Sequence, residues 1–169
     1  MTHEEFQSAA EHWSKKDALG VKMEADALKA AVEAFFADNN TCALATACGD
    51  FVRCTPIEYT WHDGAFWMFS EGGLKFFALE HNQNVCLAIY DRYDGFGSLH
   101  SAQVTGRAEM VEPFSAEYVR AAEFRKIPLA ALKALPSPMH LIKITPIHID
   151  YLCSALKEQG LNVRQTLDC

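Results

Sequence analysis

The sequence predicts a mainly β domain, in which six antiparallel strands form a closed or partly closed barrel with helices at its periphery. Two observations lead to this prediction. Short segments rich in aromatic and β-branched residues recur along the chain, and Asp63-Gly64 joins two of them as a hairpin turn, because glycine accepts the positive φ angle that such turns require. Amphipathic helical segments lie before, between and after these strands, at the edges of the predicted sheet.

The length of 169 residues and the lack of a linker predict a single domain. We divide it into a helical N-terminal extension (1–22), a barrel core (23–150) and a C-terminal tail (151–169). The net charge of -7 argues against nucleic acid or an anionic membrane as the main partner. No apolar run approaches the ~20 residues of a membrane span, and no secretory signal pattern is present, so a cytoplasmic location is expected.

The six cysteines do not form a recognisable metal or redox motif. There is no C-x-x-C pair and no His/Cys spacing of the zinc type, so no metal site is predicted. We expect free thiols, because an unpaired cysteine packs as a small hydrophobic residue.

Two helices are predicted ahead of the first strand. Residues 1–20 are expected to form a peripheral helix that lies on the barrel or on a partner subunit. Its weak apolar stripe consists of Phe6, Ala9, Ala10 and Trp13. Met23 to Asp38 is an amphipathic helix that ends at Asn39-Asn40 and should cap one end of the barrel.

The first predicted strands surround a possible ligand site. Thr41 to Ala47 is a buried strand, and a turn at Gly49 leads into the strand that carries Arg53. Pro56 lacks an N–H group, so we expect a bulge or an interrupted ladder there. After the Asp63-Gly64 turn, the strand from Phe66 to Ser70 should fold back beside the strand of Arg53.

The pattern after Ser70 is typical of an anion site. Gly72-Gly73 lies between this strand and a helix predicted from Leu74 to Glu80, and such a junction directs backbone N–H groups and the helix dipole at one place. Lys75 in the first helical turn and Arg53 on the neighbouring strand would add two cations. The alternative is an ordinary glycine turn beside two solvated side chains.

The rest of the chain completes the barrel. The loop after the Val85–Tyr90 strand contains Tyr93 and Phe96, which either cover a flat ring or pack locally. The remaining predicted elements are a strand at 101–112, helices at 115–125 and 128–135, a strand at 139–145 that ends at Pro146, a possible extension at 147–151, and a helical turn at 154–159.

Taken in order, several of these segments resemble the flavin-binding core of the pyridoxamine 5'-phosphate oxidase-like split-barrel family. The matching motifs are Arg53-Cys-Thr-Pro-Ile-Glu-Tyr, Phe69-Ser70, Gly-Gly-x-Lys75, Asn-x-x-Val85-x-Leu87 and Ser101-Ala-Gln103-Val-Thr-Gly106-Arg-Ala-Glu109. The resemblance covers about residues 24 to 150 and implies a six-stranded antiparallel Greek-key split barrel of the FMN-binding type.

The resemblance also implies a homodimer with FMN at the interface, and a phosphate held by Arg53 and Lys75. The other cofactor-binding residues that it implies are Cys54, Thr55, Pro56, Met68, Phe69, Ser70 and Ser101. The chain contains no Ser-His-Asp set, carboxylate pair or metal cluster that would serve as a catalytic centre. We therefore expect an FMN-dependent oxidoreductase that acts on a small substrate, because a flavin supplies its own redox reactivity.

Three departures from the family pattern argue against pyridoxamine phosphate oxidation itself. Glu58 and Leu74 replace a lysine and an arginine of the true oxidases, and their C-terminal Arg-x-His signature is missing. Two other functions remain open at this stage. One is a non-catalytic flavin carrier or sensor, and the other is a haem-binding barrel that uses His100, His140 or His148.

Overall fold

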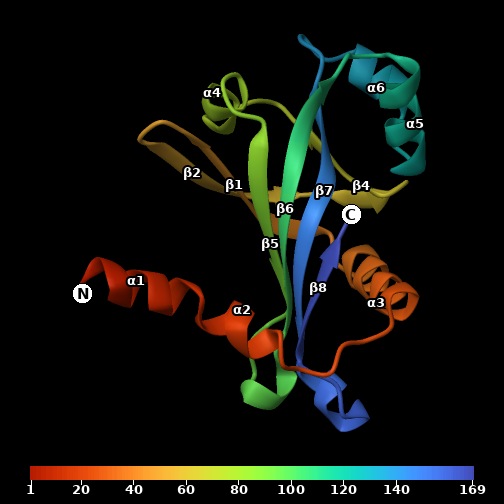
Figure 1. The fold of residues 1–169 in the computed structure, drawn as a ribbon. Coiled ribbons are helices and arrows are strands. Elements are labelled where there is room, and N and C mark those ends of the chain that lie inside the picture. The colour runs from red at the N-terminus through yellow and green to blue at the C-terminus, as the bar shows by residue number, and fades with distance from the viewer.

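The computed structural model describes residues 1–169 and confirms the predicted fold class, a mainly β split barrel with peripheral helices (Figure 1). All strands belong to one antiparallel sheet, with the order β2-β1-β5-β6-β7-β4-β3, and β8 pairs with β7. The strands are β1 (Thr41–Cys48), β2 (Phe51–Glu58), β3 (Thr60–His62), β4 (Ala65–Ser70), β5 (Asn84–Tyr90), β6 (His100–Val111), β7 (His140–Cys153) and β8 (Arg164–Asp168). No helix is both long enough and apolar enough to cross a membrane.

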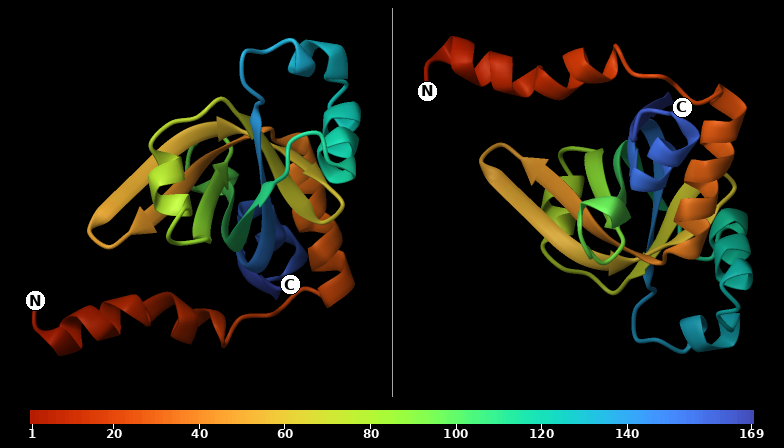
Figure 2. Two further views of the ribbon diagram at one scale, coloured as in Figure 1. Left: turned by 90° about the horizontal axis from the view of Figure 1, so that it is seen from above. Right: turned by 90° about the horizontal axis from the view of Figure 1, so that it is seen from below.

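The helices lie around this sheet (Figures 1 and 2). They are α1 (His3–Ala10), α2 (His12–Asp17), α3 (Ala25–Asp38), α4 (Lys75–Leu79), α5 (Ala116–Phe124) and α6 (Leu129–Lys133), with 3-10 turns η1 (Phe96–Ser98) and η2 (Ser154–Gln159). One apolar core lies between α3 and the inner side of the sheet, and a second, smaller core lies under α5 and α6.

The predicted number of six strands is wrong, because the sheet has eight. One additional strand, β3, arises because Tyr59 interrupts the long segment that begins at Phe51. The Tyr59 hydroxyl donates to the carbonyl of Phe36, and its backbone N–H donates to the carbonyl of Asn40. The chain bends at this buried side chain, so β2 and β3 lie at opposite ends of the strand order. The other additional strand, β8, lies in the expected tail.

The predicted pairing of the strand of Arg53 with the Phe66–Ser70 strand is also wrong. β2 forms a hairpin with β1 through Gly49 and Asp50, whereas the Asp63-Gly64 turn joins β4 to the short β3. β2 is therefore an edge strand, and this explains how it tolerates Pro56. The register continues through Pro56 without a bulge, because an edge strand has no ladder on its outer side.

Pro146 does not end β7, contrary to the prediction. The ladder between β6 and β7 shifts register at Thr105/Gly106, opposite Pro146, so the missing N–H group falls at an irregularity of the ladder. β7 then continues to Cys153 and pairs with β8. This extension gives the sheet a long, continuous central strand.

Side chains on the outer side of the sheet define a surface that we call the open sheet face. Its residues alternate with the buried ones along each strand, and no helix covers those of β1, β2 and β5 (Figure 1). Its members on these three strands are Ala43, Ala45, Ala47, Val52, Cys54, Pro56, Cys86, Ala88 and Tyr90, with the polar Thr41, Glu58 and Asn84 at its margins. Val52 and Tyr90 are 73% and 64% exposed, so this face presents apolar side chains to solvent.

The register shift at Gly106 predicts the cost of one substitution. A Cβ at this position would lie 2.8 Å from Cγ2 of Ile144 and 2.9 Å from the carbonyl oxygen of Thr145. Gly106→Ala should therefore lower the free energy of unfolding by ~1–3 kcal/mol, a typical effect of overpacking, in a urea titration. Gly97→Ala is the matched control, because a Cβ at Gly97 would have no neighbouring atom within 4 Å. Equal stability of the two variants would contradict the close packing at Gly106.

Candidate cofactor site

Lys75 is a buried ammonium group without a carboxylate partner. Its side chain lies at the start of α4 and is only 5% exposed. The Nζ atom donates a hydrogen bond to the carbonyl of Gly72 and lies 4.9 Å from the centre of the Phe76 ring. Burial lowers the pKa of Lys75, because desolvation disfavours its charged form. An anion beside Nζ would stabilise the charged form of Lys75 and so offset the cost of its desolvation.

The glycine turn before Lys75 has a defined geometry. Gly73 has a φ angle of 111°, which other residues rarely adopt. Ser70 holds the turn, because its hydroxyl accepts from the N–H of Gly72 at 3.3 Å and donates to the carbonyl of Gly72 at 3.2 Å. Ser70, predicted as a cofactor-binding residue, thus positions the same carbonyl that receives the Lys75 ammonium.

The helix after the turn is shorter than predicted. α4 contains five residues, from Lys75 to Leu79, instead of the expected Leu74 to Glu80. So short a helix carries a small dipole, since the dipole depends on aligned peptide units. Positive charge at this place therefore comes mainly from the Lys75 side chain.

Arg53 lies on β2, next to α4. The two elements are in contact, as the Phe51 and Phe77 rings lie 5.1 Å apart. The Arg53 side chain is exposed and forms no hydrogen bond or ion pair within the protomer. The structure therefore places a free guanidinium on the strand that contacts α4, the helix of the buried Lys75.

Thr46 is a polar residue of this region that the sequence prediction missed. Its hydroxyl is the only buried side-chain polar atom without a hydrogen-bond partner, and it lies directly opposite Arg53 in the β1–β2 register. α4 contacts β1, the strand of Thr46. A polar residue at an inward position of the otherwise small and apolar segment 41–47 was the available signal.

The other predicted residues of β2 point to two sides of the sheet. Thr55 shares the inner side with Arg53, whereas Cys54 and Pro56 belong to the open sheet face. A ligand bound within one protomer would meet only one of these two sets of side chains. Their roles remain predictions.

The structure places Met68 and Phe69 in the two cores. Met68 is fully buried in the main core, and Phe69 packs edge-on against Tyr118 with ring centres 5.3 Å apart. Their side chains thus support β4, which leads to the glycine turn. Whether they also contact a ligand remains a prediction.

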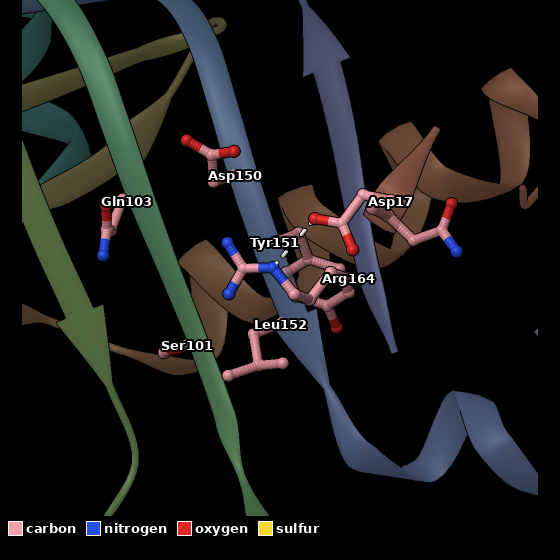
Figure 3. A pocket seen from close by; sticks show the side chains of 8 residues that line it. Asp17, Ser101, Gln103, Asp150, Tyr151, Leu152 and Arg164 are labelled. Atoms are coloured by element: carbon pink, nitrogen blue, oxygen red, sulfur yellow. Dashed lines mark hydrogen bonds and ion pairs between the residues drawn. The ribbon is translucent and has the colours of Figure 1, made fainter. Parts of the chain in front are cut away.

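Ser101 is not brought together with Arg53 in the protomer. Gly106 is the β6 residue level with Arg53 in the sheet register, and Ser101 lies five residues, ~17 Å, further along β6. It also faces the other side of the sheet. There it lines a small polar notch with Gln103, Asp150 and Arg164, at the end of α2 (Figure 3).

Only one of the three predicted haem-ligand histidines has free ring nitrogens. His100 contacts Asp91 at 2.9 Å and the Tyr151 hydroxyl at 2.8 Å. His148 contacts Asp168 at 2.6 Å, and this hydrogen bond raises its pKa. His140 forms no such bond, and it pairs with Ser70 across the β4–β7 ladder, beside the glycine turn.

The largest cavity lies elsewhere, under α3. Its volume is about 450 Å³, and its apolar lining includes Phe36, Trp61 and Ile149. None of the predicted cofactor residues lines it. Tyr93 and Phe96 pack against each other on the exposed loop, with ring centres 6.2 Å apart.

Comparison with known proteins relates this geometry to one family. A family model described as pyridoxamine 5'-phosphate oxidase matches residues 28–153. A search of curated proteins finds no significant match.

Solved structures with a similar fold have low sequence identity. A FAD-binding protein from Mesorhizobium loti has a TM-score of 0.58 and 19% identity, over 73% of this chain and 89% of that protein. ChuZ from Campylobacter jejuni has a TM-score of 0.66 and 13% identity, over 87% and 61% of the two chains. A heme-binding protein from Mycobacterium smegmatis has a TM-score of 0.60 and 18% identity, over 82% and 57%. At these identities the similarity is one of fold.

The unpaired hydroxyl of Thr46 should lower the stability of the protein without ligand. Thr46→Val replaces it with a methyl group of similar size, so we expect the free energy of unfolding without ligand to rise by ~1 kcal/mol, the desolvation cost of an unsatisfied hydroxyl. Urea titration measures this change. Thr105→Val, at an exposed position of β6, is the control and should have little effect. A clear loss of stability in Thr46→Val would mean that the hydroxyl has a partner.

Proposed function

The chain belongs to the pyridoxamine 5'-phosphate oxidase family, and on this premise we propose that it is a flavoprotein that binds FMN with its phosphate between Lys75 and Arg53. The observation that carries this proposal is the buried Lys75 ammonium without a carboxylate partner. Removal of an ammonium from water costs several kcal/mol unless a counter-charge is present. A phosphate dianion would pair with this ammonium and with the free guanidinium of Arg53.

The residues around Lys75 fit a terminal phosphate. Gly73 has no side chain, and a Cβ there would lie 3.6 Å from the Lys75 Nζ atom, so glycine keeps the space beside the ammonium free. The Gly72 carbonyl accepts from the ammonium, and Ser70 positions this carbonyl. Two cations suit the monoester phosphate of FMN, whereas riboflavin has no group for this place.

We further propose that the protein is an oxidoreductase for a small substrate. The flavin, when bound, supplies electron and hydride transfer, and the protein contributes position, exclusion of water and electrostatics. Glu58, which replaces a family lysine, forms an ion pair of 2.7 Å with Arg125. Leu74, which replaces a family arginine, is exposed. Both changes reduce the positive charge for a phosphorylated substrate, so we do not propose pyridoxamine phosphate as that substrate.

A homodimer forms part of the proposal. The apolar open sheet face is suited to burial against an identical face of a second copy, since two-fold contacts are self-complementary. The separation of Ser101 from Arg53 within one protomer is consistent with a site that residues of two protomers complete. The free thiols of all six cysteines are consistent with the proposed cytoplasmic location, a reducing compartment.

Haem binding is the second candidate function. One structural relative is described as a heme-binding protein, and His140, with free ring nitrogens, lies beside the proposed site. A Soret band on haem titration that His140→Ala abolishes would support this candidate. Tight FMN binding without such a band would reject it.

The phosphate contacts predict how flavin affinity responds to mutation. Arg53→Ala and Lys75→Met should each weaken FMN binding by ~1.5–3 kcal/mol, the strength of a hydrogen bond to a charged group, in a fluorescence titration. Riboflavin affinity should not change in either variant, because riboflavin lacks the phosphate. Lys157→Ala removes an exposed lysine on η2 and is the control. FMN affinities equal to wild type in both variants would place the phosphate elsewhere.

Flavin affinity should also depend on pH. Burial lowers the pKa of Lys75 in the free protein, and a bound phosphate favours the charged form and raises that pKa. The complex therefore retains a proton that the free protein loses, so FMN affinity should fall as the pH rises through the lowered pKa of Lys75 in the free protein. Lys75→Met should remove this decrease, since Arg53 remains charged throughout. An identical pH profile in Lys75→Met would contradict the assignment.

Enzymatic activity has a separate test. An FMN-dependent oxidoreductase should consume NADH or NADPH in the presence of an added electron acceptor, and the rate should depend on bound FMN. A protein that retains FMN but does not consume either donor would be a flavin carrier or sensor.

A further inference from the structure

The N-terminal helices are anchored to the barrel at a single point. The Asp17 carboxylate, at the end of α2, accepts a hydrogen bond from Arg164 Nε at 2.9 Å (Figure 3). It accepts a second one from Asn162 Nδ2 at 3.2 Å. Asp17 is buried, and the Trp13 ring covers the Arg164 guanidinium at 4.9 Å. Gly20 fits closely against Asn162, because a Cβ there would clash with this side chain at 2.5 Å. Residues more than a hundred positions apart in sequence thus anchor these helices. We call this contact between Asp17, Trp13, Asn162 and Arg164 the Asp17 root.

Beyond this root, every residue of α1 and α2 is exposed in the protomer. α1 has no buried residue, and Figure 2 shows that it extends away from the barrel. Phe6, Ala9 and Ala10 lie on one side of α1, and Phe6 is 61% exposed. An isolated helix of eight residues is only marginally stable in water.

The helices cannot easily fold back onto their own barrel. Backbone hydrogen bonds continue through the junction of α1 and α2, from Glu11 N to Gln7 O and from Lys15 N to Glu11 O, both at 3.0 Å. The Lys15 ammonium also pairs with the Glu11 carboxylate at 2.6 Å. The two helices therefore form a stiff rod, whose direction the Asp17 root determines.

The rod begins on the same side of the sheet as the open sheet face. Asp17 lines the polar notch together with Ser101 and Gln103, which are outward residues of β6. A molecule that covers the open sheet face would therefore lie next to the exposed side of α1. The self-complementary apolar face makes a second copy of the chain the natural occupant.

The area of the open sheet face supports this choice. The outer sides of β6 and β7 continue this face with polar residues such as Gln103 and Asp150. Together the five strands, at ~4.8 Å spacing and ~27 Å length, give a footprint of ~650 Å², of which ~390 Å² lies on β1, β2 and β5. A stable dimer buries ~800 Å² per partner, so the face alone falls short. The rod of α1 and α2, ~22 Å long and ~10 Å wide, would add ~220 Å².

We propose that α1 and α2 form an arm that clasps the second protomer, with the Phe6 side of α1 packed on the partner. This inference rests on the homodimer of the proposed function and adds a specific contact to it. Each arm remains anchored in its own protomer through Asp17 and becomes buried only in the dimer. The arm would stabilise the dimer without contributing to the core of either barrel.

The test compares two full-length variants. Phe6→Asp places a charge in the proposed contact, and Leu135→Asp places one on an exposed leucine after α6, far from the arm (Figure 1). Phe6→Asp should weaken dimerisation roughly tenfold or more in sedimentation velocity over a wide concentration range, and Leu135→Asp should match wild type. Circular dichroism and urea titration of the monomeric form should not distinguish the two variants, because Phe6 contacts no core residue.

Hydrogen exchange of the α1 amides provides an independent measurement. They should be protected at concentrations where wild type is dimeric and exchange rapidly after dilution to monomer. A dimer with unprotected α1 amides, unaffected by Phe6→Asp, would overturn the arm but leave the homodimer intact. A monomer at all concentrations would overturn both, and FMN retention on gel filtration would then test the cofactor separately.

Discussion

The architecture depends on the buried corner at Tyr59. Its hydroxyl donates a hydrogen bond to the last turns of α3, and its backbone N–H donates one to the residue that precedes β1. Burial raises the pKa of Tyr59, so the hydroxyl remains a donor. The ring packs against Phe66 at 5.1 Å. These contacts separate β2 from β3 and place them at opposite edges of the sheet. As a result, Arg53 lies on an open edge, and β4 leads directly to the glycine turn.

The candidate site combines groups that are costly in the free protein. The buried ammonium of Lys75 has no carboxylate partner, and the hydroxyl of Thr46 has no hydrogen-bond partner. Lys75 lies on α4, which contacts the strand of Thr46. Such groups are uncommon in a domain whose other buried polar side chains are satisfied. A bound phosphate would supply the missing counter-charge. The cost of the buried ammonium in the free protein would then favour cofactor binding.

The two sides of the sheet have different roles. The inner side forms the core against α3, and the open sheet face presents small apolar side chains that a protomer alone leaves in water. The polar root at Asp17 directs the N-terminal arm to the same side. Dimerisation, the arm and completion of the cofactor site would then be coupled, because all three depend on what covers this face.

The sequence alone determined the fold class, most of the elements and the Gly-Gly-x-Lys75 turn, because period, turn residues and motif order are local properties of the chain. It did not determine the pairing of β2, the strand character of β8 or the continuation of β7 through Pro146, since these depend on partners distant in sequence. Tertiary structure also decided that Thr46 lies unpaired opposite Arg53 and that Met68 is buried. Burial and register arise only when the sheet closes around Tyr59, so no local pattern specifies them.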